Sequence, residues 1–297
     1  MSIDRLTLWQ TYVRVIETGS FSAVAKELAT SQPRVSKQIA ALEAQLGVRL
    51  LRRSTRKLSM TEEGERLYAQ ARRIVQEVSE VESQLKGAGQ PQGTLRVACP
   101  PVFARMKLLP HAAAFLHQYP QLGLEFSVQD RFVDLVEDGI DVAIRIGEVA
   151  DSGLHARRIG TVRRICVGAP RYLEEHGVPD SPAELRVHNC ILYTLLATGT
   201  TWPFEKMPVK VFGRVRGNSP EVVTTMVLNG LGIAMAPAFL FTEGLGSGQL
   251  REILKPWPLP GLPIHALHLA RRYVPGRIKL FVDHLAQAFA ADKELRI

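Results

Sequence analysis

A short cluster near the start of the chain has the residue types and spacing that read base edges in DNA. Gln32, Ser36 and Lys37 lie within six positions, with Pro33 among them. A glutamine amide pairs with adenine through two hydrogen bonds, a lysine reaches guanine or a phosphate, and a serine hydroxyl suits either. Further on, residues 50–60 read LLRRSTRKLSM and bring four cations suited to phosphate contacts.

The cluster is predicted to lie on the second of two short helices within residues 20–46, with a tight polar turn between them. Ser20 and Ser31 stand where helix N-caps are expected. Pro33 falls in a first turn, where its missing N–H costs nothing, and Gly47 follows as a stop signal. Two helices joined in this way can present the second one to a DNA major groove.

The apolar spacing indicates which face of the second helix turns inward. At ~100° per residue the polar residues gather on the opposite face, near its N-terminal end, followed by small alanines. The inward set is Val35, Ile39, Leu42 and Leu46, and the outward set is Pro33, Ser36, Lys37, Ala40 and Ala44. The alternative interpretation is the solvated face of an ordinary helical bundle.

The neighbouring segments favour DNA binding. An earlier helix is predicted from the stripe Trp9, Tyr12, Val13 and Ile16, ended by Gly19. After the second helix, residues 50–60 are typical of a hairpin with a basic tip, a wing that reaches phosphates or the minor groove. Residues 1–60 carry ten basic and four acidic side chains, so +6 of the net charge of +8 lies in this fifth of the chain.

A long helix is predicted from Thr61 onward, with Glu62, Glu63 and Glu65 in its first turn, where the helix dipole favours them. Its apolar residues follow a 3.5-residue repeat, which is typical of a coiled coil. They are Leu67, Ala71, Ile74, Val78, Val81 and Leu85. The pattern favours a homodimer whose paired recognition helices read an inverted repeat. The alternative is a helix packed on its own domain.

The run SFSAVAKELATSQPRVSKQIAALEAQLGVRLLRRSTRKLSMTEEGERL resembles the winged helix-turn-helix of LysR-type transcriptional regulators. The resemblance covers the SQP-x-VS-x-QI-x-x-LE-x-x-LG core, the basic wing and the start of the linker helix. It implies DNA contacts from Gln32, Pro33, Ser36, Lys37 and Arg56. The predicted DNA-binding set also includes Ser31 and Arg34 of the same helix start and Arg52 and Arg53 of the wing. Lys37 replaces a frequent arginine of the family, which weakens the expectation of bidentate guanine recognition.

After Gly87, Gly89, Pro91 and Gly93 the periodicity changes to alternating strands and helices, which predicts a mainly parallel sheet covered by helices. Strands are predicted at 94–99, 122–129, 141–146, 164–168, 209–216, 233–236 and 264–270. Helices are predicted from 100 to 119 and at 130–138, 219–229 and 276–291. The fold class is therefore α/β overall, with a mostly α head and a long linker helix.

Ligands of open α/β sheets bind at the carboxyl ends of the strands. The predicted ligand-binding residues are Pro100, Pro101, Val102, Gln129, Arg145, Gly147, Asn218 and Ser219. Here the chain resembles the effector-binding portion of the same family, two periplasmic-binding-protein-like lobes that take a small organic effector. Pro100 and Pro101 remove two backbone donors, so we expect a less anionic effector or one held from the second lobe. Alternatively, Arg145 pairs with a neighbouring carboxylate instead of a ligand. Asn218 and Ser219 alternatively cap the helix that follows them.

The predicted domains are a winged helix-turn-helix at 1–60, a linker and dimerisation helix with hinge at 61–90, and an effector-binding domain at 91–297. Lobe I takes about 91–161 plus 268–297, and lobe II about 162–267. The expected partners are double-stranded promoter DNA, the effector and a second copy of the chain. The family further implies a homotetramer, and RNA polymerase is an additional candidate.

Other functions have less support. No nucleophile elbow, phosphate-binding glycine loop or metal cluster is recognisable, so we expect no enzyme activity, cofactor or metal. The three cysteines are sparse, which favours a reducing cytoplasm; for Cys99 a buried strand position is favoured over a redox sensor. The N-terminus lacks a signal-peptide pattern and no apolar run suits a membrane, which disfavours a solute-binding protein of transport. An architectural DNA binder without an effector stays open.

Overall fold

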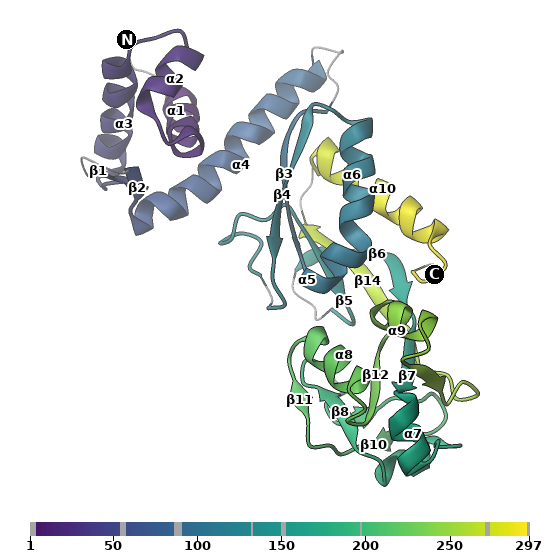
Figure 1. Ribbon diagram of the computed structural model, residues 1–297. Coiled ribbons are helices and arrows are strands. Elements are labelled where there is room, and N and C mark those ends of the chain that lie inside the picture. Colours follow the sequence, from purple (N-terminus) through teal and green to yellow (C-terminus); the bar gives the residue numbers. More distant parts are fainter. Residues whose placement is uncertain are drawn as a thin grey trace. The chain divides into compact units, whose positions relative to one another are not determined.

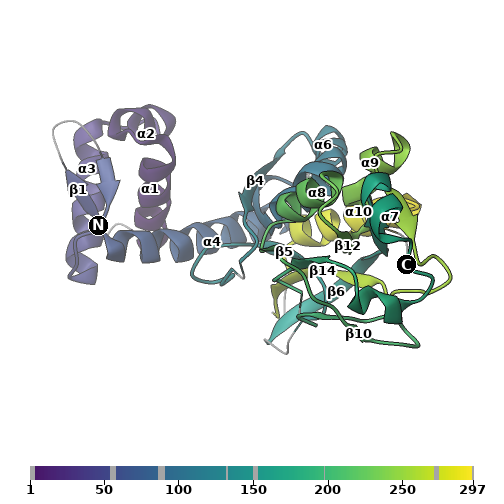
Figure 2. The same ribbon diagram turned by 60° about the horizontal axis from the view of Figure 1, so that its bottom comes forward.

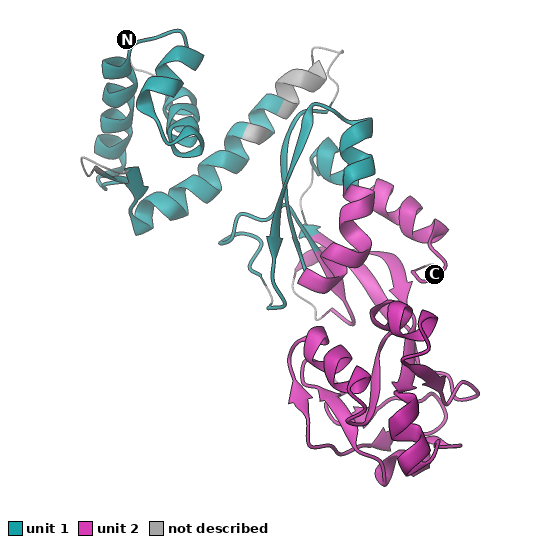
Figure 3. Ribbon diagram, viewed as in Figure 1, with its two compact units in different colours: residues 1–99, 113–143, 268–281 teal, residues 100–112, 144–267, 282–297 magenta. Residues whose placement is uncertain are grey.

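The computed structural model describes residues 4–53, 58–85, 91–131, 133–149, 153–196, 198–270 and 274–295. Two compact units emerge, one made of residues 1–99, 113–143 and 268–281 and the other of residues 100–112, 144–267 and 282–297 (Figure 3). Helices and strands mix in both, so the predicted α/β class is confirmed.

Three helices form the head of the first unit (Figure 1): α1 (Arg5–Thr18), α2 (Phe21–Glu27) and α3 (Gln32–Leu46). They enclose one apolar core because each turns its apolar stripe inward. The core contains Leu8, Tyr12, Val15, Val24, Ala25, Val35, Ile39, Leu42, Leu50 and Leu51. The predicted helices are therefore confirmed, and Leu46 is half-buried against the same core.

The helix ends follow the predicted signals with one exception. Gly19 and Gly47 end α1 and α3 in the left-handed conformation, with φ of 64° and 69°, which glycine adopts without steric cost. The Ser20 hydroxyl accepts a hydrogen bond from the Ala23 amide at 3.2 Å. Ser31 occupies the N-cap of α3, but its side chain makes no capping hydrogen bond, so the predicted cap is wrong in that respect.

A two-stranded hairpin follows, β1 (Leu51–Arg53) and β2 (Leu58–Met60), antiparallel with Leu51 opposite Met60 (Figure 2). The next helix, α4, runs from Glu62 to Leu85 and begins with the predicted acidic turn. The Thr61 hydroxyl accepts from the Gly64 amide at 3.0 Å and donates to the Arg49 carbonyl at 2.6 Å. It therefore caps α4 and ties that helix to the segment leading into the hairpin.

Gly64 lies where two parts of the head meet. A Cβ at this position would be 2.2 Å from the Leu50 carbonyl oxygen and 3.0 Å from the Tyr12 hydroxyl. That hydroxyl donates to the Gly64 carbonyl at 2.8 Å. The first turn of α4 is thus packed backbone against backbone on the head, and no larger residue fits without a shift.

The remainder of the chain forms two five-stranded sheets, with orders β4-β3-β5-β14-β6 and β11-β8-β12-β7-β13. The first contains β3 (Gly93–Cys99), β4 (Leu122–Val128), β5 (Val142–Ile146), β6 (Leu154–Val162) and β14 (Leu262–Leu269). β3 is parallel to β4 and β5. Helices α5 (Pro101–Phe103) and α6 (Leu109–Gln118) follow β3, joined by a π-helical turn, η1 (Ala104–Leu108), and α10 (Gly276–Ala291) follows β14.

The second sheet lies within the second unit, with β7 (Arg164–Gly168), β8 (Cys190–Tyr193), β11 (Arg216–Gly217), β12 (Ile233–Pro237) and β13 (Arg251–Ile253). β8, β11 and β12 are parallel, whereas β7 is antiparallel to β12 and β13. Apolar cores cover both faces of the sheet. The helical elements are α7 (Pro170–His176), η2 (Pro182–Arg186), α8 (Pro220–Leu228), η3 (Ala238–Phe241) and α9 (Thr242–Gly246), and a separate pair is β9 (Thr201–Trp202) with β10 (Val209–Lys210).

Two predicted elements are wrong. The helix expected at 130–138 is not found in the described part of that range, where residues 135–138 form turns. The Asp134 carboxylate accepts from the amides of Val136 and Glu137, and these bonds replace helical hydrogen bonds. The strand expected at 209–216 is split between β10 and β11. Gly213 interrupts it where the backbone passes Cys190, since a Cβ there would be 1.6 Å from the Cys190 carbonyl oxygen.

Candidate functional site

The outer face of α3 carries the predicted DNA-reading residues. Gln32, Pro33, Arg34 and Lys37 are exposed and Ser36 is half-buried. Within the described ranges, the side chains of Gln32, Arg34 and Lys37 make no hydrogen bond or ion pair, so their donor groups remain available to a ligand. A polar, cationic face at the beginning of a helix that packs through its opposite side is the arrangement of a recognition helix.

Polar contacts as well as apolar packing hold α3 from behind. The Thr11 hydroxyl of α1 lies 3.2 Å from the Gln38 amide oxygen, and both side chains are buried. Gln38 immediately follows Lys37, so this hydrogen bond helps to fix the rotation of α3 about its axis next to the last cation of the outer face. Sequence reasoning missed Gln38, because nothing local distinguishes a buried glutamine from an exposed one.

The wing is described in part. Arg52 lies on β1, opposite Ser59, and its side chain is exposed without a partner among the described residues. Arg53 ends the same strand. Arg56 and the side chain of Arg53 lie outside the described residues, so their predicted contacts stay predictions.

The apolar repeat of α4 divides into two parts. Leu67 packs against the core of the head and Ala71 is fully buried, so this end of the repeat packs within its own chain. Ile74 is 37 % exposed and Val78 is half-buried. The side chains of Val81 and Leu85 lie outside the described residues. The predicted dimerisation face therefore begins no earlier than Ile74.

Arg72 of α4 contacts carboxylates on two sides, a role that no local signal in the sequence predicts. Its guanidinium lies 3.6 Å from the Glu17 carboxylate of α1 and 3.0 Å from that of Glu125 on β4. Arg96 of β3 pairs with Glu125 as well, at 2.8 Å. Because Arg72 is buried, these contacts hold α4 against its own unit rather than offering a charge to a ligand.

The predicted effector residues follow strand ends, as expected. Pro100, Pro101 and Val102 follow β3, and the Gln129 amide after β4 donates to the Cys99 carbonyl at 3.1 Å. Gly147 follows β5, with φ of 109° and its amide bonded to the Pro263 carbonyl at 2.8 Å. The first of these contacts places Gln129 beside the end of β3.

Of the three other predicted effector residues, Ser219 has the structural role that its alternative predicted. Arg145 is buried within β5. Ser219 caps α8, since its hydroxyl accepts from the Glu221 amide at 3.2 Å. Asn218 is exposed between β11 and that cap. None of these roles excludes an effector, so the assignment stays a prediction.

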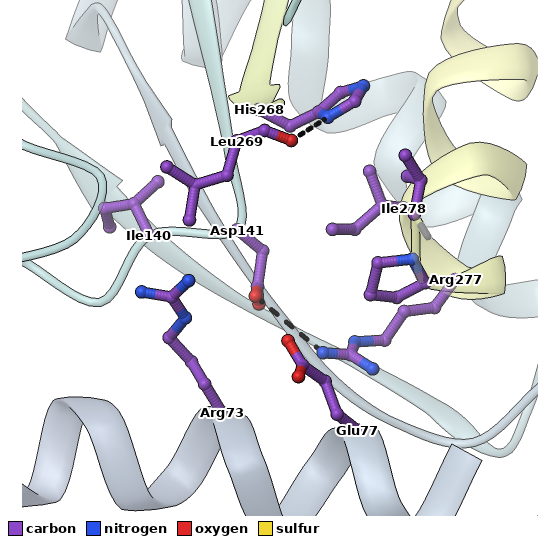
Figure 4. A pocket seen from close by; sticks show the side chains of 10 residues that line it. Arg73, Glu77, Ile140, Asp141, His268, Leu269, Arg277 and Ile278 are labelled. Carbon is purple, nitrogen blue, oxygen red and sulfur yellow. Dashed lines mark hydrogen bonds and ion pairs between the residues drawn. The ribbon is translucent and has the colours of Figure 1, made fainter. Parts of the chain in front are cut away.

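A small cavity in the first unit lies between α4 and the start of α10 (Figure 4). It has a volume of about 20 Å³, and Arg73, Asp141 and Arg277 face one another in it. Asp141 and Arg277 lie 3.7 Å apart. Burial raises the pKa of Asp141 and lowers that of Arg277 to about 10. The cavity holds an ion pair, is too small for an organic effector and contains none of the predicted effector residues.

The cysteines and other metal-ligating groups offer no second site. Cys99, Cys166 and Cys190 form no disulfide in the described parts of the chain, and all three are buried. Burial raises the pKa of Cys190 to about 12 and that of Cys166 as well, which disfavours the reactive thiolate. Across the residues that the structure describes, no group of three His, Cys, Asp or Glu side chains is placed to hold a metal ion, and no helix is long and apolar enough to span a membrane.

Known proteins resemble the chain over both of its functional parts. Residues 6–65 match the bacterial regulatory helix-turn-helix of the lysR family, and residues 88–290 match the LysR substrate binding domain. The transcriptional regulator PtxR of Pseudomonas aeruginosa is 36% identical over 283 residues, which cover 93% of this chain and 90% of PtxR. DmlR of Escherichia coli is 36% identical over 289 residues, which cover 94% of this chain and 92% of DmlR.

Solved structures agree with these matches. CrgA, a LysR-type transcriptional regulator from Neisseria meningitidis, superposes with a TM-score of 0.60 at 32% identity and covers 97% of this chain and 99% of its own. The Vibrio cholerae virulence activator AphB gives a TM-score of 0.57 at 28% identity, covering 96% and 99%. These relatives are regulators and not enzymes, as predicted. The chain belongs to the LysR family of transcriptional regulators, with a helix-turn-helix that binds DNA and a substrate-binding domain that takes a small-molecule effector.

Proposed function

We propose that this regulator binds promoter DNA through the outer face of α3 and the wing. The supporting observation is that Gln32, Arg34 and Lys37 are exposed together at the beginning of α3 and have no partner in the described parts of the chain. Arg52 extends the cationic surface onto the wing. Base edges are read from α3, while the wing cations neutralise phosphates beside the groove.

The test uses fluorescence anisotropy with the intergenic DNA upstream of the regulator's own gene. A shuffled duplex of equal length and base composition is the control. At physiological salt we expect at least about a thousand-fold preference for the promoter DNA, with an affinity that falls steeply as salt is raised. Equal affinity for the two duplexes would contradict sequence-specific binding.

The DNA-binding unit is a homodimer formed through the second half of α4, and it reads an inverted repeat. Ile74 supports this, because it belongs to the 3.5-residue apolar repeat and its side chain is nevertheless exposed to solvent in the single chain. Ile74→Glu should yield monomers in analytical ultracentrifugation. It should also weaken binding to the full site far more than to one half-site. A homotetramer and a contact with RNA polymerase are further expectations from the family.

The effector is a small organic molecule bound in the second unit, where Pro100, Gly147 and Asn218 follow β3, β5 and β11. Pro100 begins this region as the N-cap of α5 and Pro101 is the first residue of that helix, so neither has an N–H to offer an anion. Exposed Asn218 supplies an amide at the end of β11. This favours a weakly anionic effector, in a cytoplasmic protein that has direct access to promoter DNA.

A thermal-shift screen with small organic acids and aromatic compounds tests the effector. A compound at 100 times its Kd should stabilise the folded protein by about 2.7 kcal/mol. Asn218→Ala should reduce that shift without changing the melting temperature of the free protein. A compound whose shift is unchanged in this variant would contradict the assignment of Asn218.

A further inference from the structure

Glu43 lies on α3, away from the DNA-reading face, and contacts the segment that leads into the wing. One carboxylate oxygen, Oε1, accepts from the Leu50 amide at 2.9 Å and from the Leu51 amide at 3.2 Å. The other oxygen, Oε2, lies 3.2 Å from the guanidinium of Arg49. The Glu43 side chain is 9 % exposed, whereas that of Arg49 is 84 % exposed. The two hydrogen bonds from the backbone amides are therefore shielded from solvent, whereas the ion pair with Arg49 is not.

The same short segment is held from its other side by Thr61. The Thr61 amide donates to the Leu50 carbonyl at 3.0 Å, and the Thr61 hydroxyl donates to the Arg49 carbonyl at 2.6 Å. Glu43 thus fixes the N–H groups at the base of the wing, while Thr61 fixes the carbonyls. Leu51 is the first residue of β1, so the hydrogen bond from its amide to Glu43 joins α3 directly to the wing.

The connection matters because the two proposed DNA contacts lie on either side of it. Lys37 precedes Glu43 by six residues, a rise of roughly 9 Å along α3. Arg52 follows Leu51 by one residue, on the strand that Glu43 holds. The distance between the cation on the helix and the cation on the wing is therefore set through the Glu43 carboxylate.

We propose that Glu43 is a positioning residue for DNA binding, one that sets the spacing between α3 and the wing without touching DNA. The inference rests on the proposed wing contact of Arg52. What the role requires is an acceptor oxygen at the reach of a glutamate side chain, because both protected contacts are hydrogen bonds from backbone amides. The negative charge itself is dispensable, since Arg49, its cationic partner among the described residues, is exposed to solvent.

Three variants of the full-length protein separate reach from charge. Glu43→Gln keeps the oxygen and its reach but loses the charge. Glu43→Asp keeps the charge but withdraws the oxygen by one methylene, and Glu43→Met removes the acceptor at similar volume. We expect promoter affinity within about two-fold of the unaltered protein for Gln, and a loss of about ten-fold for Asp and Met, the size of one lost hydrogen bond.

A double-mutant cycle with Arg52→Ala tests whether the loss passes through the wing. In the unaltered protein and with Glu43→Gln, Arg52→Ala should reduce the slope of log affinity against log salt by about 1. With Glu43→Asp or Glu43→Met that effect should disappear, because the wing no longer reaches the phosphate. Lys37→Ala is the control and should keep its full effect in every background, since α3 remains in place.

Three results would overturn the inference. The first is that Arg52→Ala still reduces the salt slope in the Glu43→Asp and Glu43→Met backgrounds. The second is that Arg52→Ala has no effect in the unaltered protein. The third is that the effect of Lys37→Ala disappears in the same backgrounds as that of Arg52→Ala. If Glu43→Met does not fold, the comparison of Gln with Asp decides alone. Failure of the unaltered protein to prefer promoter DNA would contradict the proposed function instead.

Discussion

The helices α3 and α4 both carry positively charged side chains, but they place them differently. In α3, Arg34 and Lys37 are exposed and pair with no described residue. In α4, Arg72 is buried and pairs with Glu17 and Glu125. Exposed cations without an intramolecular partner remain available to bind a polyanion, whereas a buried and paired cation stabilises the fold. The two helices should therefore respond to mutation in different assays.

The largest effect is expected for Arg72→Met. Methionine retains much of the apolar stem but leaves the carboxylates of Glu17 and Glu125 without this partner. Removing one member of a buried pair costs roughly 3–5 kcal/mol, and because both carboxylates are partly exposed we expect about 2–3 kcal/mol here. Urea unfolding measures the loss.

Arg66→Met on the same helix is the matched control. Arg66 pairs with Glu62 one turn earlier at 2.6 Å, but both side chains are more than 70 % exposed to solvent (78% and 73%). The free energy of unfolding should change by no more than about 0.5 kcal/mol. Equal losses in the two variants would remove the distinction between buried and exposed cations.

Lys37→Ala should act on binding and not on stability. We expect about ten-fold weaker promoter binding, which corresponds to about 1.4 kcal/mol. The free energy of unfolding should stay within about 0.5 kcal/mol of the unaltered protein, as for other exposed positions. Anisotropy titrations and urea unfolding on the same preparation provide both values.

Lys279→Ala controls for the loss of one positive charge, because Lys279 is exposed on α10. It should leave promoter affinity within about two-fold. If Lys37→Ala lowered stability as much as affinity, the division between an inner and an outer face of α3 would be wrong.

The two serines at helix starts extend the comparison to uncharged groups. Ser20→Ala removes the hydrogen bond to the Ala23 amide and should cost about 1 kcal/mol of stability. Ser31→Ala removes no capping bond and should cost at most a few tenths. If the Ser31 hydroxyl contacts DNA, its loss should weaken promoter binding about three-fold. Thermal melts and anisotropy compare the pair, and equal losses of stability would mean that Ser31 caps α3 after all.

The smallest effect concerns pH, and it separates the head from the remainder of the chain. The first histidine in the sequence is His111, so neither α3 nor α4 contains a group that ordinarily titrates near pH 6.5. Burial lowers the pKa of His111 and of His188. As the pH falls, these histidines are protonated in the unfolded chain before they are protonated in the folded protein. Their contribution to the free energy of unfolding is therefore fully present above about pH 6.5 and decreases below it.

Melting temperatures between pH 7.5 and 5 test this dependence. His188→Gln should flatten the profile, whereas the same change at the exposed His117 should leave it as it was. A melting temperature that rises on acidification would show that the sign is wrong.

Local signals were sufficient to predict much of the head. Apolar spacing, caps and glycine stops predicted α1, α2 and α3, because each depends on residues within one or two turns. The outer face of α3 followed from the same periodicity. The buried roles of Gln38, Glu43 and Arg72 could not be predicted, since their partners Thr11, Leu50 and Glu125 are distant or on other elements.

The errors in the α/β region have the same origin. Residues 130–138 have helix-forming composition, but the Asp134 side chain competes for backbone amides that a helix needs. Residues 209–216 alternate like one strand, but the backbone contact at Gly213 with Cys190 divides them. A contact between segments about twenty residues apart leaves no periodic signal in either of them.

The close packing at Gly64 affects how this regulator could be recombined with its relatives. Thr61 and Gly64 belong to α4 in sequence, but their contacts with Arg49, Leu50 and Tyr12 make them part of the head. A chimera joined at residue 60 would pair these contacts with foreign side chains. A junction placed after Arg72 transfers these contacts together with those that Leu67 and Arg72 make with the head, and it should give exchanged regulators that fold and keep the operator preference of the protein that supplies the head.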